Sequence, residues 1–108
     1  MIKYVYIAGP YTNGGVVHNI QSAIDWAETI MERGFVPFVP HLTHLWDIYS
    51  PHTWEAWLEY DLKWIDKCDA LFRMPGESPG ADKEVEYALE HNIPVFLSIV
   101  DLVKHRGY

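Results

Sequence analysis

Short apolar runs alternate along the chain with segments in which apolar residues recur at helical spacing. Residues 2–8 are rich in β-branched and aromatic side chains and are followed by Gly9 and Pro10. This pattern is typical of a buried strand that leads into a loop. Further short apolar runs predict strands over residues 35–39, 69–74 and 93–99.

Between the predicted strands, the period of 3.6 residues indicates amphipathic helices. The predicted helices cover residues 16–33, 53–67 and 81–91. Gly34 is a typical helix-ending residue, and Thr53 can cap the second helix. Ser78 followed by Pro79 is a typical helix start. We expect a polar loop over residues 41–52 and a short tail after the fourth strand.

This order of elements predicts a single α/β domain over residues 1–108. Strands joined by helices form right-handed crossovers in a parallel sheet. We therefore expect three layers, with a sheet of about four strands between helices on both faces. Ligands of such sheets bind beyond the carboxyl ends of the strands. Those ends lead into loops 9–15, 41–53 and 75–80.

The charge and composition narrow the choice of partners. The net charge is −7 and no basic residues form a run, which argues against a nucleic-acid partner. No apolar run is long enough to span a membrane, and the N-terminus predicts a strand rather than a signal peptide, so we expect a cytoplasmic protein without a membrane partner. Cys68 is the only cysteine, which excludes a disulfide within the chain. The short, aromatic-rich chain favours a homodimer or a higher homo-oligomer.

The second predicted helix places a carboxylate among apolar residues. Its inward face carries Trp54, Trp57, Leu58, Leu62, Ile65 and Cys68. Asp61 lies in the middle of this face, three residues after Leu58 and four before Ile65. An ionised carboxylate in apolar surroundings is costly unless it is paired. Asp61 therefore either pairs with a buried donor such as Tyr4, Tyr6 or a tryptophan N–H, or lines a cavity where desolvation raises its pKa.

A second carboxylate lies on the third predicted helix. Glu84 is at the edge of the inward face, within about the first turn. The helix dipole there favours negative charge, which predicts a lowered pKa and an ionised carboxylate available for attack. In the preceding loop, Gly80 lets a ligand approach the backbone N–H groups that follow Ser78, as an anion or hydroxyl site requires. A stabilising first-turn glutamate and an ordinary helix start would give the same sequence.

Three segments of the chain match, in order, the sequence motifs of a known family. They are Y-I-A-G-P-Y-T at residues 6–12, D-L-K-W-I-D-K-C-D-A at residues 61–70 and S-P-G-A-D-K-E-V-E-Y-A at residues 78–88. Together they resemble the nucleoside 2-deoxyribosyltransferase family and the related 2'-deoxynucleoside 5'-phosphate N-hydrolases. The resemblance implies a flavodoxin-like or Rossmann-like fold. Its register places the family's nucleophile on Glu84 rather than Glu86, and its catalytic aspartate on Asp61.

The resemblance implies an enzyme, either a nucleoside 2-deoxyribosyltransferase or a nucleoside or nucleotide N-glycosidase. Glu84 would attack C1' of the sugar while Asp61 gives a proton to the leaving base. A second base or water would then attack the glycosyl-enzyme intermediate, so transfer and hydrolysis both fit. The substrate would be a nucleoside or a nucleoside 5'-monophosphate, with no cofactor and no metal. Candidate substrate-binding residues are Gly9, Tyr11, Asn13, Gly14, Ser78 and Gly80.

Two features bear on how a substrate would be held. The first loop, P-Y-T-N-G-G at residues 10–15, contains no Arg or Lys, whereas the phosphate-binding hydrolases carry a basic residue there. Trp46, Trp54 and Trp57 could form a stacking wall for a base, although aromatic residues at helical spacing usually belong to a core.

Two other functions are compatible with the sequence. His41, His44 and Asp47 are spaced by three residues, with His52 close behind, and two histidines with a carboxylate can bind zinc or iron in a metal-dependent hydrolase. The same fold could also serve as a non-catalytic nucleotide-binding or sensing module. A pure binding module would not need both Asp61 and Glu84, which favours the enzyme.

Overall fold

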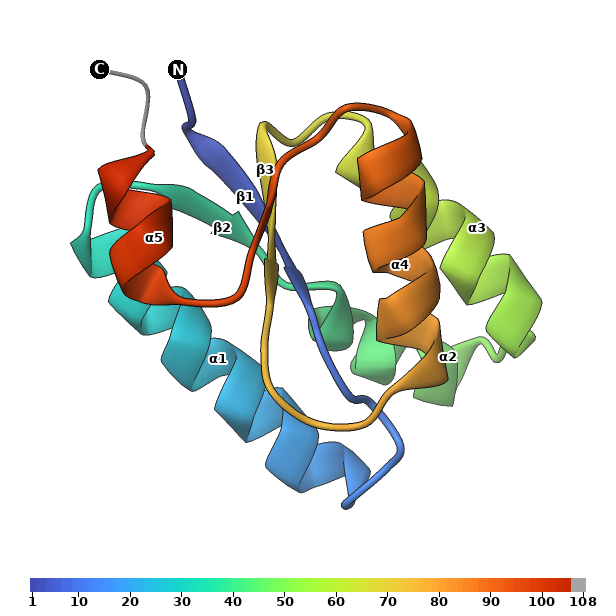
Figure 1. The fold of residues 1–108 in the computed structure, drawn as a ribbon. Coiled ribbons are helices and arrows are strands. Elements are labelled where there is room, and N and C mark those ends of the chain that lie inside the picture. The colour runs from blue at the N-terminus through green and yellow to red at the C-terminus, as the bar shows by residue number, and fades with distance from the viewer. Residues whose placement is uncertain (106–108) are drawn as a thin grey trace.

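A single parallel sheet forms the centre of the molecule. The structure, a computed structural model, describes residues 1–105. Within them, the strands are β1 (Tyr4–Ala8), β2 (Val36–Phe38), β3 (Ala70–Arg73) and β4 (Val95–Phe96), in the spatial order β2-β1-β3-β4. All neighbouring strands are parallel, with Tyr4 opposite Val36 and Val5 opposite Ala70. β1 is thus a central strand, flanked by β2 on one side and β3 on the other (Figure 1).

Helices cover both faces of this sheet. α1 (Val16–Glu32) and α5 (Ile99–Lys104) lie on one face, and α3 (Trp54–Ile65) and α4 (Pro79–Glu90) on the other (Figure 1). A 3₁₀ helix (Pro40–Thr43) and α2 (His44–Tyr49) connect β2 to α3. The α/β fold with three layers and a four-stranded parallel sheet, predicted from the alternation of elements, is confirmed.

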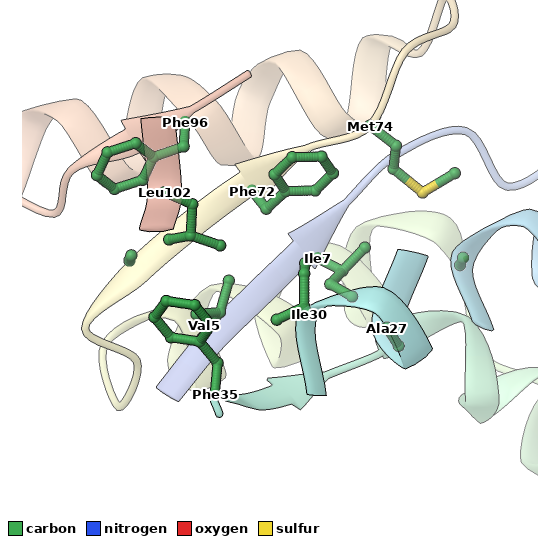
Figure 2. Packing of buried hydrophobic residues seen from close by; sticks show 11 residues of the cluster. Val5, Ile7, Ala27, Ile30, Phe35, Phe72, Met74, Phe96 and Leu102 are labelled. Atoms are coloured by element: carbon green, nitrogen blue, oxygen red, sulfur yellow. The ribbon is translucent and has the colours of Figure 1, made fainter. Parts of the chain in front are cut away.

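The two faces of the sheet bury separate sets of side chains because successive residues of a strand point in opposite directions. Val5 and Ile7 of β1 pack beneath α1 and α5, together with Phe72 of β3 (Figure 2). Tyr6 and Ala8 point to the other face, where they pack under α3 and α4. Tyr6 is a polar-tipped side chain with no exposed surface, so its hydroxyl needs a partner inside the protein.

The helix starts follow the predicted capping residues. Thr53 Oγ1 accepts a hydrogen bond from the backbone N–H of Ala56, at 3.1 Å, at the start of α3. Ser78 Oγ accepts one from the N–H of Ala81, also at 3.1 Å, and Pro79 occupies the first turn of α4. α4 therefore begins two residues earlier than the apolar period alone predicts.

Two segments differ from the prediction. Residues 41–52 are not a loop, since the 3₁₀ helix and α2 occupy most of them; both helices are short and bury few apolar side chains, so they leave no core-facing period. The fourth strand is limited to Val95–Phe96, because Ser98 caps α5 by accepting a hydrogen bond from the N–H of Asp101. The predicted tail is therefore partly helical.

Among the described residues, no helix combines the length and the apolar character needed to cross a membrane.

Candidate active site

A cavity of about 480 Å³ opens beyond the carboxyl ends of β1, β2 and β3. After β1 the chain adds β2 on one side of β1, and it then returns to place β3 on the other side. The connections that follow β1 and β3 therefore lead in opposite directions, which leaves a crevice between them at the carboxyl ends of these strands. Crevices of this kind are the usual ligand sites of open parallel sheets. The cavity is lined by the loop after β1, by the 3₁₀ helix and α2 after β2, and by residues of α3 and α4.

Glu84 enters this cavity from α4. Ala81 and Ala88, one turn on either side, pack against the sheet and fix the orientation of the helix. Only 6% of Glu84 is exposed, although the residue lines the cavity. The hydroxyl of Tyr6, on β1, donates a hydrogen bond to Glu84 Oε2. The carboxyl group is thus held at the floor of the cavity by a side chain from the central strand.

Asp61 enters the same cavity from α3. Its Oδ1 is buried and has no hydrogen-bond partner among residues 1–105. The Tyr6 hydroxyl lowers the pKa of the Asp61 carboxyl as well as that of Glu84, so one phenol acts on both acidic groups. Of the two readings of Asp61, a fully paired structural carboxylate does not account for the bare oxygen, and a cavity-lining acid does.

Burial dominates the protonation of both carboxyl groups. It raises the pKa of Asp61 to about 7 and that of Glu84 to about 8, while the Tyr6 hydroxyl acts in the opposite direction on each. The raised pKa of Asp61 agrees with the prediction. The prediction of a lowered pKa for Glu84 is wrong, because Glu84 is the sixth residue of α4 and the helix-dipole effect is confined to the first turn.

The two acidic groups interact and therefore titrate as a pair. Between their pKa values, the pair holds about one proton. Because the pKa of Glu84 is the higher of the two, the proton of the pair resides mainly on Glu84 in the free protein. The hydrogen bond donated by Tyr6 and the unpartnered oxygen of Asp61 favour the other form, in which Glu84 is ionised and Asp61 is protonated. The singly protonated pair thus presents one carboxylate and one carboxylic acid to the same cavity.

Most of the predicted substrate-binding residues line this cavity. They are Gly9, Tyr11, Asn13, Ser78 and Gly80. Gly14 does not; it lines a neighbouring cavity of about 300 Å³. At Gly9, a Cβ atom would lie 2.4 Å from the side chain of Met74, so close packing also requires glycine at this position.

The residues of the metal alternative do not come together. Among the described residues, no group of three or more His, Cys, Asp or Glu side chains is arranged to hold a metal ion. His41 Nε2 pairs with the carbonyl oxygen of Pro10 at 2.9 Å, and His44 Nδ1 with the hydroxyl of Tyr11. Asp47 is bound to Trp57 and to the backbone of His52. The polar groups of this segment shape the wall of the cavity instead.

Sequence reasoning missed several residues of the cavity. Tyr6 appeared only as a possible partner of Asp61, and its bond to Glu84 joins positions 78 residues apart, which no local pattern reveals. Asp47 and His52 were considered only as metal ligands, yet both line the cavity. Of the three candidate tryptophans, Trp54 and Trp57 line it, whereas Trp46 packs edge-on against Trp57.

The fold is shared with solved structures. A 2-deoxyribosyltransferase from the psychrotolerant bacterium Bacillus psychrosaccharolyticus superposes with a TM-score of 0.64 at 18% identity, over 85% of this chain and 69% of that enzyme. A 2-deoxyribosyltransferase from Leishmania mexicana gives 0.62 at 18% identity, over 86% of this chain and 61% of that one. A conserved protein from Enterococcus faecalis V583 gives 0.71 at 14% identity, over 99% and 77%.

The sheet order, the helical layers and these superpositions define a protein with the flavodoxin-like fold of the nucleoside deoxyribosyltransferases. Residues 3–98 match the family described as a domain of unknown function (DUF7768), and the chain belongs to that family. No curated protein matches the sequence.

Proposed function

We propose that this protein cleaves the N-glycosidic bond of a nucleoside or nucleoside 5'-monophosphate, by base transfer or hydrolysis, through a covalent intermediate on Glu84. The observation that carries the proposal is a pair of carboxyl groups, the buried Glu84 and the partly buried Asp61, which line one cavity, with the Tyr6 hydroxyl bound to Glu84. Two solved 2-deoxyribosyltransferases have the same fold, which supports chemistry of this class.

In the first step, an oxygen of the Glu84 carboxylate attacks C1' and forms a C–O bond. The C1'–N bond breaks, its electron pair goes to the base nitrogen, and Asp61 delivers the proton that the departing base needs. In the second step, water or a second base attacks C1', the bond to Glu84 breaks, and Asp61 takes up the proton that the attacking group loses. Both displacements invert C1', so the overall configuration is retained.

Tyr6 acts in this scheme as a positioning residue. Its hydroxyl orients the Glu84 carboxyl and favours the ionised form, which is the form that attacks. Its ring packs parallel to Phe38, with the ring centroids 5.7 Å apart, so the phenol itself is held firmly. This bond thereby raises the fraction of the singly protonated pair that holds its proton on Asp61, where the leaving base requires it.

Replacing Tyr6 with Phe tests this positioning role. The variant keeps the packed ring but loses the hydrogen bond that lowers the pKa of Glu84. The wild-type profile of kcat/KM against pH should be bell-shaped, and in Tyr6→Phe both of its limbs should move up by about one unit, because the Tyr6 hydroxyl lowers the pKa of both carboxyl groups. Tyr4→Phe, at a partly exposed position of the same strand, is the matched control. Slower turnover with an unmoved limb would contradict the assignment.

A substrate panel tests the proposed function directly. The protein is incubated with single nucleosides and 5'-monophosphates, with and without a second free base, and the products are separated by chromatography. Free base released without an acceptor identifies hydrolysis, and a new nucleoside formed only with an acceptor identifies transfer. Binding without any product would contradict the proposal and favour the nucleotide-binding module.

The proposal treats the whole chain, residues 1–108, as one nucleoside deoxyribosyltransferase-like domain, of which 106–108 lie outside the described residues. We also propose that the protein assembles into a homodimer or a higher homo-oligomer. Large apolar side chains stand exposed on α2 and at the start of α3, among them Leu45, Ile48, Tyr49 and Trp54, and a second copy would cover such a surface.

A further inference from the structure

Asp47, on α2, presents a fixed carboxylate to the cavity. Its Oδ1 accepts two hydrogen bonds, one from the indole Nε1–H of Trp57 at 2.6 Å and one from the backbone N–H of His52 at 2.9 Å. These donors, Trp57 first, hold the pKa of Asp47 below its usual value. In the part of the chain that the structure describes, no group donates to Oδ2. The carboxylate is therefore ionised and oriented, with one acceptor oxygen unused.

The position of this oxygen relative to Asp61 is set by α3. Trp57 and Asp61 are four residues apart and share one face of the helix, which separates them by about one turn, roughly 5.4 Å along the axis. Asp47 is bound to the indole N–H of Trp57, so its carboxylate is tied to the α3 side chain one turn before the proposed proton donor. Both groups line the same cavity.

A base that takes its proton from Asp61 must lie against that residue. Since Trp57 and Asp47 line the same cavity as Asp61, they are available to the edge of the base that faces away from Asp61. The aromatic surfaces of Trp54 and Trp57 line this part of the cavity and suit a planar ring. Asp47 adds to this part of the cavity a carboxylate with one unused oxygen.

We propose that Asp47 recognises an exocyclic amino group on the leaving base, and this inference rests on the proposed function. An ionised carboxylate only accepts hydrogen bonds, so it pairs with an amino group and repels a carbonyl oxygen at the same position. Sites built around a specific hydrogen bond discriminate between partners, because the wrong partner leaves the acceptor without its donor. The preferred substrates would be nucleosides of amino-bearing bases, such as cytosine and adenine, over their carbonyl counterparts uracil and hypoxanthine.

Two matched pairs of substrates test the preference, 2'-deoxycytidine against 2'-deoxyuridine and 2'-deoxyadenosine against 2'-deoxyinosine. Within each pair, an amino group is exchanged for a carbonyl group. We expect wild-type kcat/KM to be higher for the amino member by about tenfold or more. Equal values, or a preference for the carbonyl member, would overturn the inference while leaving the proposed function intact.

The variant Asp47→Asn sharpens the test. Its amide oxygen can still accept from Trp57 and His52, while its amide NH₂ replaces the unused oxygen and faces the base as a donor. The preference should therefore shift by about tenfold or more toward the carbonyl member of each pair. Asp25→Asn removes the same charge from an exposed position of α1, on the opposite face of the sheet, and should leave the preference unchanged. An unaltered preference in Asp47→Asn would remove Asp47 from base recognition.

Calorimetric binding separates this inference from the proposed function. The variant Glu84→Gln lacks the proposed nucleophile, so 2'-deoxycytidine and 2'-deoxyuridine can be titrated into it without turnover. Tighter binding of 2'-deoxycytidine, by about tenfold, supports the assignment even if the wild-type protein cleaves neither nucleoside, an outcome that would refute only the proposed function. Equal binding of the two nucleosides to this variant would refute the assignment of Asp47.

Discussion

Replacing Glu84 with Gln should abolish glycosidic cleavage and at the same time stabilise the protein. Without the carboxylate there is no nucleophile for C1', and we expect kcat to fall by at least about 10³-fold. Initial rates on the best nucleoside of the panel measure this loss. The side chain keeps its size and can still accept the hydrogen bond from Tyr6, so the packing around it should not change.

The gain in stability should depend on pH. Burial raises the pKa of Glu84 to about 8, well above the value of about 4.5 for an unperturbed glutamate. The folded protein therefore favours the protonated group, whose stabilising contribution is complete below pH 4.5 and is lost as the pH rises through 8. The neutral amide of Glu84→Gln cannot ionise, so the variant does not lose stability in this way as the pH rises. Its melting temperature should match wild type near pH 4.5 and exceed it at pH 8, where each kcal/mol corresponds to about 4–8 °C in a domain of this size.

Glu86→Gln is the matched control on the same helix. Glu86 is exposed, two residues from Glu84, and does not line the cavity. The variant should keep nearly full activity and show no pH-dependent change in stability relative to wild type. If Glu86→Gln is inactive and Glu84→Gln active, the register that places the nucleophile on α4 is wrong.

Hydrophobic periodicity was sufficient to predict the long helices because each packs one side against the sheet, although α3 fully buries only Ile65 and leaves Trp54 exposed. α3 and α4 begin where Thr53 and Ser78 cap them, as the sequence indicates. The orientation of α1 was harder to predict from the sequence. Ile24 and Met31 belong to its apolar pattern but are exposed. The buried face is centred on Ala23, Ala27 and Ile30. Small residues allow close packing of α1 on the sheet, and an apolar count alone does not distinguish them.

α2 and β4 could not be predicted in the same way. α2 has six residues and none of them is buried, so its helical form rests on local hydrogen bonds rather than on a core-facing pattern. β4 pairs with β3 over only two residues, although the apolar run that contains it is longer. Neither element leaves a period in the apolar pattern from which its bounds could be predicted.

The candidate site, like the fold, has features that the sequence predicts and features that only the structure shows. Asp61 was accessible because a carboxylate in an apolar helix face violates the pattern around it, and the structure gives it a buried oxygen without a partner. The pKa of Glu84 could not be predicted, because its burial depends on how α4 packs against β1. There Tyr6, 78 residues away in the sequence, donates a hydrogen bond to it. Periodicity identifies the side chains that face inward, whereas their electrostatics depend on what the fold places opposite them.

Asp61→Asn should give a stable, correctly folded protein that is nearly inert on natural nucleosides. Removing the proton donor should lower kcat/KM by roughly two to four orders of magnitude, the usual worth of a general acid. The loss should be smaller for a 7-methylpurine nucleoside, because its base is already cationic and leaves without a proton. This difference between substrates is specific to a proton donor, since a residue that merely supports the fold would affect both equally.

The stability of the same variant distinguishes the acid from a structural partner. Burial raises the pKa of Asp61 to about 7, so the carboxyl group stabilises the fold fully below about pH 3.8 and this contribution is lost as the pH rises through 7. Asp61→Asn should therefore melt at or above the wild-type temperature at pH 8. If Asp61 were instead the partner of a buried donor, its removal would cost about 1–3 kcal/mol. Thermal melts and initial rates on one preparation decide the matter, and a strongly destabilised variant with normal rates per folded molecule would remove Asp61 from the mechanism.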